Sequence, residues 1–279
     1  MIKKILLLAA AVATSSFATW DYFNLLQNSQ GSIKGGLYYD WDDDWSQMGL
    51  KAGARMNLTP QLELSLQGFG YQLWGETECG AACEEGGSGL RDLTIGARFA
   101  LDPELFAFLD FNLPIGKDKK TGLGRTPPSK NEMFLYFGIQ HTKVIESIKG
   151  ATYGAEAGVF WGFEHHDLER GLEIRGGGEF DYALPTAPVT LLIGGEIWLR
   201  LFESEYNDKD LGDDWSQQYK IWLGADFAVN EKISIKGKII VRSQDLKTKK
   251  FAADDPRIGQ RIDMEGDAKG FTVDVEFKF

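Results

Sequence analysis

The feature that most limits how this chain can fold is the alternation of apolar and polar residues over long segments. Apolar side chains occupy every second position of residues 48–58, and the same pattern fills 93–101, 221–229 and 271–279. Period two is the periodicity of a β-strand with one apolar and one polar face. Globular strands are usually nearer ~5–6 residues, whereas ~9–11 residues cross a membrane when the strand is tilted. The alternation therefore predicts membrane-spanning strands.

Applied to the whole chain, this pattern predicts an all-β fold, an antiparallel up-and-down transmembrane β-barrel of about twelve strands. The strands are expected near residues 32–41, 47–58, 61–73, 90–101, 105–115, 132–141, 151–163, 172–183, 189–202, 217–229, 233–242 and 270–279. Short turns such as Asp102-Pro103-Glu104 and Asn230-Glu231-Lys232 carry turn chemistry. They are expected at the periplasmic rim, and the long polar loops, 74–89, 116–131, 203–216 and 243–269, on the extracellular side.

Composition alone suggests a different answer, an acidic soluble protein. The chain has 279 residues, a net charge of -11 and 43% hydrophobic residues, with a mean hydropathy of -0.25. No apolar run approaches the ~18 residues of a membrane-spanning helix, and an acidic chain is a poor partner for nucleic acid. In a barrel, only every second residue faces lipid, so the average hydropathy remains low. The composition therefore excludes a helical membrane protein but not a β-barrel.

The N-terminus has the pattern of an export signal. Lys3 and Lys4 precede the apolar run 5–12, and small residues lead to Ala18. This order is typical of a secretory signal peptide, and a buried N-terminal helix is the alternative. We therefore divide the chain into a signal peptide cleaved after Ala18 (1–18), a short periplasmic segment (19–30) and the barrel (31–279).

Two cysteines, Cys79 and Cys83, share a Gly- and Glu-rich stretch of one predicted loop. After export into an oxidising compartment, such a pair is expected to form a small loop disulfide. Two cysteines without a nearby histidine make a poor zinc site. We predict no metal site and no cofactor.

The chain ends on an aromatic residue, Phe279, at the close of the alternating segment 271–279. This ending resembles the C-terminal strand of Gram-negative outer-membrane β-barrel proteins of the porin-like kind. The strand end 112–116, Asn-Leu-Pro-Ile-Gly, is similar to one seen in some porin-like transporters. The resemblance implies that Phe279 is an assembly signal read by the barrel-assembly machinery. It also implies an outer membrane as the location, with outer-membrane lipids and lipopolysaccharide as partners.

Aromatic residues near the predicted strand ends fit the two interfacial girdles of such barrels. The set expected near the long loops is Trp41, Trp45, Trp74, Trp161, Trp198, Trp215 and Tyr219. The set expected near the short turns is Phe99, Phe180, Tyr182, Phe227 and Phe279.

The polar strand faces carry charges of both signs, which the alternation directs into the lumen. The predicted lumen-facing charges are Lys51, Arg55, Arg98, Glu156, Glu173, Arg175, Glu179, Asp181, Glu196, Arg200, Lys220, Asp226, Lys236, Lys238 and Arg242. Acidic and basic walls facing one another would orient polar solutes in a transverse field. Alternatively, the charges pair across neighbouring strands and fill the interior. Barrels of ~8 strands are filled and those of ~16 hold a channel, so both arrangements remain open for twelve.

These observations predict a channel for passive diffusion of small polar solutes. A closed structural or surface-interaction barrel without transport is the alternative. An outer-membrane lipid hydrolase is a third possibility. A serine hydrolase would need a histidine that acts as a base and activates the serine. The chain has only His141, His165 and His166, none placed by the strand phase beside a suitable hydroxyl. We therefore predict no catalytic residue and no enzymatic activity.

Overall fold

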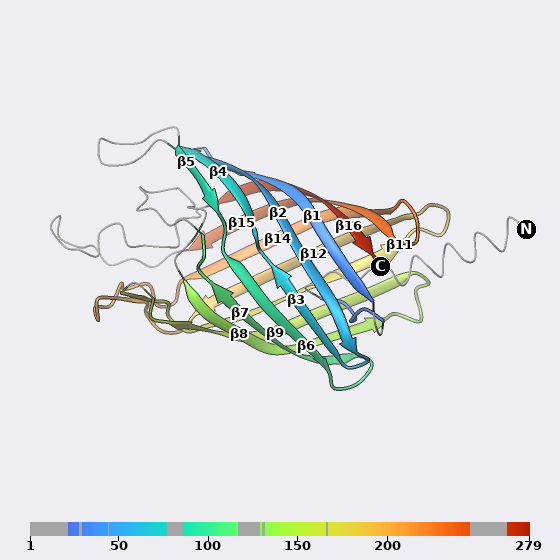
Figure 1. Ribbon diagram of the computed structural model, residues 1–279, viewed down its shortest axis with the longest axis horizontal. Coiled ribbons are helices and arrows are strands. Elements are labelled where there is room, and N and C mark those ends of the chain that lie inside the picture. Colours follow the sequence, from blue (N-terminus) through green and yellow to red (C-terminus); the bar gives the residue numbers. More distant parts are fainter. Residues whose placement is uncertain are drawn as a thin grey trace, which may run out of the picture.

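The computed structural model describes residues 22–27, 30–43, 45–76, 86–116, 129, 132–165, 167–245 and 267–279. Within these residues, every regular element is a β-strand (Figure 1). In chain order the strands are β1 (Gly31–Trp41), β2 (Trp45–Thr59), β3 (Leu62–Gln67), β4 (Gly70–Glu76), β5 (Gly86–Leu90), β6 (Leu93–Ala100), β7 (Leu105–Leu113), β8 (Met133–Val144), β9 (Ala151–Phe163), β10 (Leu168–Glu169), β11 (Glu173–Ala183), β12 (Val189–Arg200), β13 (Glu205–Tyr206), β14 (Gln217–Ala228), β15 (Ile233–Asp245) and β16 (Ala268–Lys278). No helix among the described residues is long and apolar enough to cross a membrane.

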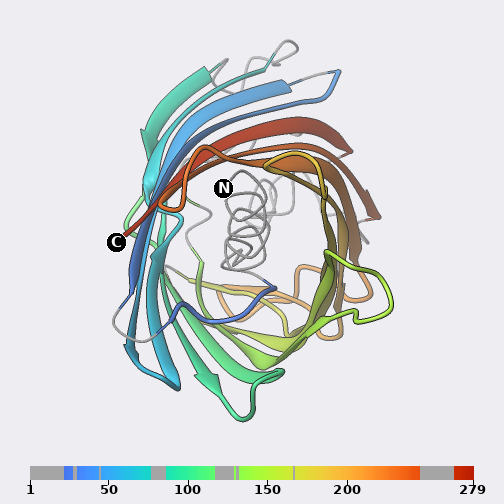
Figure 2. The same cartoon turned by 90° about the vertical axis from the view of Figure 1, so that its right-hand side faces the viewer.

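Fourteen of these strands form one antiparallel sheet that closes on itself, because β1 pairs with both β2 and β16. β3 and β4 follow one another along β2, and β6 and β5 pair with β3 and β4 respectively, so each of these two pairs is one interrupted wall strand. The described residues therefore form a twelve-stranded barrel, which confirms the predicted fold class. Figure 2 looks into this ring from the short-turn end.

Short turns at one end of the barrel follow the predicted chemistry. The Asp102 carboxylate accepts hydrogen bonds from the backbone N–H groups of Glu104 and Leu105 at 2.7 and 2.8 Å. Asn230 does the same for the N–H groups of Lys232 and Ile233, at 2.8 and 3.0 Å. Such side-chain bonds satisfy backbone donors that a tight reversal leaves unpaired. They fix the register in which the next strand leaves the turn.

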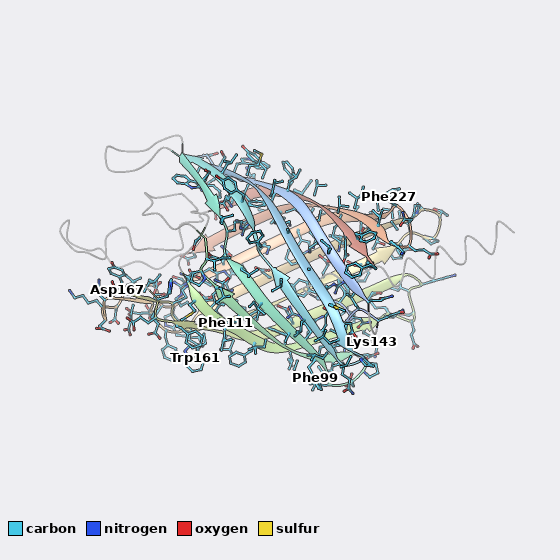
Figure 3. All side chains as sticks on the ribbon, viewed as in Figure 1. Phe99, Phe111, Lys143, Trp161, Asp167 and Phe227 are labelled. Atoms are coloured by element: carbon cyan, nitrogen blue, oxygen red, sulfur yellow. The ribbon has the colours of Figure 1, made fainter. Side chains whose placement is uncertain are left out.

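The outer wall of the barrel is apolar and the inner wall is polar. Leu50, Leu223 and Ile239 are each more than 60% exposed, at 65%, 62% and 65%. Their strand neighbours on the other face are largely covered, as in β16, where burial alternates residue by residue. Figure 3 shows side chains projecting around the whole barrel. Such a continuous apolar belt is stable only when lipid or a similar phase covers it.

The aromatic girdles are only partly as predicted. Trp161 and Trp215 are 50% and 58% exposed and lie on the outer wall. Trp45, Trp74 and Trp198 are instead buried, at 2%, 6% and 7% exposure, so the girdle prediction is wrong for these three. Each has the inward phase of its strand: Trp198 alternates with outward Ile197 and donates its indole N–H to Gln218 Oε1 at 2.8 Å. Nearness to a strand end does not decide which side of the wall an aromatic side chain occupies.

Candidate functional site

The structure places the predicted charges on the inner wall of the barrel. Each of the fifteen is covered or partly covered, and the strand phase puts each opposite lumen side chains of the neighbouring strands. The most enclosed are Arg200 and Glu173 at 0% exposure, Asp181 at 1% and Glu179 at 2%. The lumen is therefore lined by titratable side chains of both signs.

Most of these charged side chains form ion pairs with other lumen-facing side chains, and most of the pairs join different strands. Lys238 Nζ lies 2.5 Å from Glu179 Oε2, and Lys220 Nζ lies 2.9 Å from Glu196 Oε2. Further pairs are Arg98–Asp110 at 2.8 Å, Arg242–Asp40 at 2.9 Å, Lys51–Asp274 at 3.0 Å, Arg55–Glu276 at 3.4 Å, Arg55–Glu63 at 3.5 Å and Lys236–Asp226 at 3.9 Å. Pairing satisfies charges that would otherwise be desolvated. Of the two arrangements open from the sequence, the structure has the paired one.

A denser ionic network closes around Glu173 at the long-loop end. Its carboxylate meets Arg175 at 2.6 Å, Arg200 at 2.7 Å and Arg170 at 3.4 Å. Arg200 also pairs with Asp213, and Arg170 Nη2 lies 3.3 Å from Glu132. The network joins β11, β12 and the adjoining loops. It therefore holds these loops to the long-loop end of the barrel.

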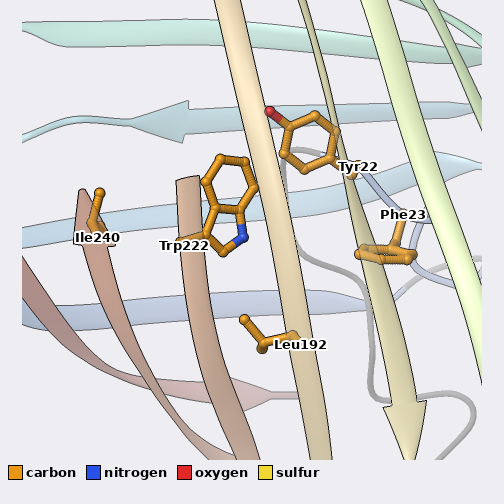
Figure 4. Close-up of a cluster of buried hydrophobic side chains, with 5 residues drawn as sticks. All are labelled: Tyr22, Phe23, Leu192, Trp222 and Ile240. Carbon is orange, nitrogen blue, oxygen red and sulfur yellow. The ribbon is translucent and has the colours of Figure 1, made fainter. Parts of the chain in front are cut away.

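Residues 22–26, which precede β1, lie against the inner wall of the barrel. Tyr22, Phe23 and Leu26 are 5%, 4% and 7% exposed. Tyr22 stacks on Trp222 of β14 with ring centroids 5.9 Å apart. Tyr22 and Phe23 form one buried cluster with Leu192, Trp222 and Ile240 (Figure 4). We call residues 22–26 the plug, since they occupy lumen space that barrel side chains leave open.

Wall residues on several strands hold the plug. Thr142 Oγ1 donates a hydrogen bond to the Tyr22 carbonyl at 2.8 Å, and Gln140 Nε2 donates to the Phe23 carbonyl at 3.1 Å. On the other side, the Leu26 N–H donates to Glu63 Oε2 at 2.8 Å. Gly154 makes the site possible, because any β-carbon there would overlap the Tyr22 carbonyl. The plug is thus a fitted part of the barrel interior.

Beyond the plug, the lumen opens into a cavity of about 470 Å³, which we call the vestibule. Charged, amide and aromatic side chains line it, among them Tyr38, Asp40, Gln72, Arg91, Phe134 and Arg242. Ile240 belongs both to this lining and to the buried cluster, so the cluster forms the inner end of the vestibule.

One wall of the vestibule is ordered by a chain of hydrogen bonds. The Tyr38 hydroxyl donates to Gln72 Oε1 at 2.5 Å, and Gln72 Nε2 donates to Gln47 Oε1 at 2.8 Å. Gln47 Nε2 then donates to Asp40 Oδ2 at 2.8 Å, which Arg242 also contacts at 2.9 Å. Because each member orients the next, this wall presents a fixed polar surface to a solute.

A second cavity, of about 360 Å³, lies on the short-turn side of the plug. Plug residues Asn24, Leu25 and Leu26 form one side of it, and turn residues 100–103 with Phe106 form the other. The second cavity therefore contacts the plug directly, whereas the vestibule meets the buried cluster around the plug at Ile240.

Solved structures contain the same architecture. The COG4313 outer membrane channel from Pseudomonas putida F1 has a TM-score of 0.69 at 13% identity, covering 95% of this chain and 100% of that one. LpxR from Salmonella typhimurium has a TM-score of 0.51 at 11% identity, covering 88% and 99%. The β-domain of the Bordetella autotransporter BrkA also has 0.51, at 12% identity, covering 91% and 100%. The fold is that of an outer-membrane β-barrel. No family model and no curated protein matches the sequence.

Two of the three histidines, His141 and His165, are among the described residues. His141 is on the outer face of β8 near the short turns, 3.8 Å from Glu104 and 5.6 Å, between ring centroids, from Tyr153. His165 is in the turn before β10, paired with Leu168. No group of three or more potential metal ligands occurs in the part of the chain that the structure describes. His166, Cys79 and Cys83 lie outside the described residues.

The small β10–β13 ladder above the barrel carries two facing carboxylates, Glu169 and Glu205. Burial, followed by the charges of Glu205 and Glu164, raises the pKa of Glu169. The folded ladder therefore favours the protonated acid relative to the unfolded segment, and acidification through the raised pKa should stabilise the ladder.

We expect the amide protons of residues 168–169 and 205–206 to exchange more slowly as the pH falls below neutral, after correction for intrinsic rates. Glu169→Gln should give the slow exchange already at neutral pH and remove the pH dependence. Glu231→Gln, in a short turn at the opposite end, is the matched control. Hydrogen exchange read by NMR measures the effect, and an unchanged profile in Glu169→Gln would contradict the assignment.

Proposed function

We propose that the protein is a channel of a Gram-negative outer membrane that admits small polar solutes by passive diffusion. The observation that carries the proposal is the vestibule, a polar cavity of about 470 Å³ in the barrel lumen that reaches the buried cluster at Ile240. Charged pairs and amides along its wall replace part of the water around a solute, which is how narrow pores admit polar molecules. Like the channel from Pseudomonas putida F1, the chain has a porin-like barrel.

The plug sets the limit on what passes. A solute leaving the vestibule meets the Tyr22–Trp222 stack before it reaches the second cavity. The plug accepts hydrogen bonds from Gln140 and Thr142 of β8 and donates one to Glu63 of β3, and none of these bonds is shared by several charged groups as in the Glu173 network. We infer a narrow channel whose conductance depends on the position of the plug.

Export and assembly follow from the same proposal. Cleavage after Ala18 would leave a mature chain that includes the plug, residues 22–26. Phe279 closes the wall: its N–H and carbonyl both bond to Gly31 at 2.9 Å, and its ring stacks on Phe277. We infer that the barrel-assembly machinery recognises this strand, and that the outer wall then contacts membrane lipid and lipopolysaccharide.

The test is a planar bilayer containing the refolded mature protein. The proposal predicts discrete conductance steps, smaller than those of an open barrel of this strand number. A second candidate, a closed structural barrel, is favoured by the fit of the plug and predicts no steps from correctly folded protein. Heat-modifiable migration on a gel verifies folding in both cases, so silence from a folded sample would overturn the channel proposal.

A further inference from the structure

The wall of the vestibule contains an irregularity that changes which side chains face the lumen. Between Lys51 and Ala54 of β2 lie two residues, whereas their partners Gly70 and Leu66 are separated by three. The extra residue falls at Gly68, whose φ of +78° is in the left-handed region that favours glycine. This is a β-bulge, a feature that re-aims side chains next to functional sites.

The neighbouring wall strand is out of phase at the same level. Leu90 and Ile95 both face outward, at 45% and 42% exposure, although an odd sequence separation should put them on opposite faces. The phase shift turns two consecutive residues, Arg91 and Asp92, into the vestibule. Regular alternation would have allowed only one of them to face inward.

Arg91 differs from the other cations of the vestibule in its partners. Its guanidinium lies over the Tyr38 ring, 4.9 Å from the centroid, and among the described residues it has no carboxylate partner. Lys51, Lys220 and Arg242 are paired with Asp274, Glu196 and Asp40. The stack holds the guanidinium plane in place and leaves its N–H groups for an incoming acceptor.

The acids of the vestibule already have partners. Glu132 pairs with Arg170 at 3.3 Å, and Asp92 accepts a hydrogen bond from the Gly116 N–H at 3.1 Å. Asp40 and Glu196 are held by Arg242 and Lys220. A ligand with one anionic group finds one guanidinium to bind, whereas a second anionic group would meet these fixed carboxylates. Phe134 and the amides of Gln72, Asn112 and Gln218 suit an uncharged remainder with hydroxyl or ring character.

We propose that the vestibule is a binding site for small organic monocarboxylates, with Arg91 as the residue that binds the carboxylate. A guanidinium fork and a carboxylate make two parallel hydrogen bonds, which gives orientation as well as attraction. A cavity of about 470 Å³ accommodates a solute of the size of a single sugar acid. The inference names the solute class of the proposed channel and rests on that function for its physiological meaning, but binding itself does not require conduction.

The test is calorimetric titration of the folded protein in detergent with sodium gluconate, and with glucose and trisodium citrate as comparison probes. We expect saturable gluconate binding in the millimolar range, weakened about tenfold or more by Arg91→Gln. Lys236→Gln, which removes a lumen cation outside the vestibule that is paired with Asp226, should change the affinity by less than about threefold. Glucose and citrate should bind at least about tenfold more weakly than gluconate.

Equal affinity of Arg91→Gln and the unaltered protein, or no gluconate binding at all, would overturn the inference. Arg91→Lys serves as a second variant, since it retains the charge without the fork and should bind with intermediate affinity. Bilayer recordings separate the two proposals. Binding that depends on Arg91 in a barrel that does not conduct would refute the channel proposal and support the monocarboxylate site. Conduction without such binding would refute the monocarboxylate site and support the channel proposal.

Discussion

Replacing Tyr22 and Phe23 with alanine should raise the single-channel conductance of the reconstituted barrel by about two- to fivefold. The two rings lie in a buried cluster between the vestibule and the second cavity, and Tyr22 stacks on Trp222. Their removal widens the narrowest part of the path without touching the strand register. Single-channel recording in potassium chloride measures the change directly.

A second variant should also raise the conductance, and it leaves the sequence of the plug unchanged. Gly154→Ala places a methyl group where the Tyr22 carbonyl now lies, so the plug must shift. It should also raise the conductance, by a smaller factor. Tyr71→Ala is the control, because Tyr71 is 47% exposed on the outer wall. Unaltered conductance in the double alanine variant would show that the plug is not the constriction.

Glu173→Gln should lower the free energy of unfolding by about 3–5 kcal/mol, the usual cost of leaving buried charges without their partner. Glu173 is fully buried and is shared by Arg170, Arg175 and Arg200, so the substitution leaves three guanidinium groups without this carboxylate. Urea unfolding in lipid vesicles, followed by tryptophan fluorescence, measures the loss.

The matched control for this network is Glu196→Gln. Glu196 and Lys220 are 32% and 26% exposed, and an ion pair open to water contributes only about 0–1 kcal/mol. Similar losses in the two variants would mean that burial of the Glu173 network has no special effect. If Glu173→Gln fails to refold, Arg175→Gln removes a single, partly exposed arm of the same network and should give an intermediate loss.

The wall of the barrel is predictable from the sequence because its signal is local. A residue that faces lipid is apolar whatever lies across the lumen, so alternation in segments such as 48–58 and 271–279 reveals both the strand and its phase. Even the turns at Asp102 and Asn230 can be recognised, since their hydrogen bonds join residues two or three positions apart.

The interior is less predictable because its contacts join residues far apart in the chain. Nothing near Tyr22 indicates that Thr142 and Trp222 will surround it; the one available signal is the group of three aromatic residues just after the predicted cleavage site. Strict period-two alternation also misses the phase shift at Arg91, because it continues one strand through 90–101 and lets only one of two consecutive residues face inward. Trp45 and Trp74 show the same limit, since an indole is apolar enough for lipid yet is buried inside.

The pairing of β1 with β16 also constrains the order in which the molecule is assembled. Ser32 of β1 pairs with Lys278 of β16. The ring therefore cannot close until β16 has joined the sheet. The plug contacts β3, β8 and β14, which lie on different sides of that ring. It must therefore be in place before closure or thread in afterwards through a narrow opening. Contacts of such long sequence separation form slowly.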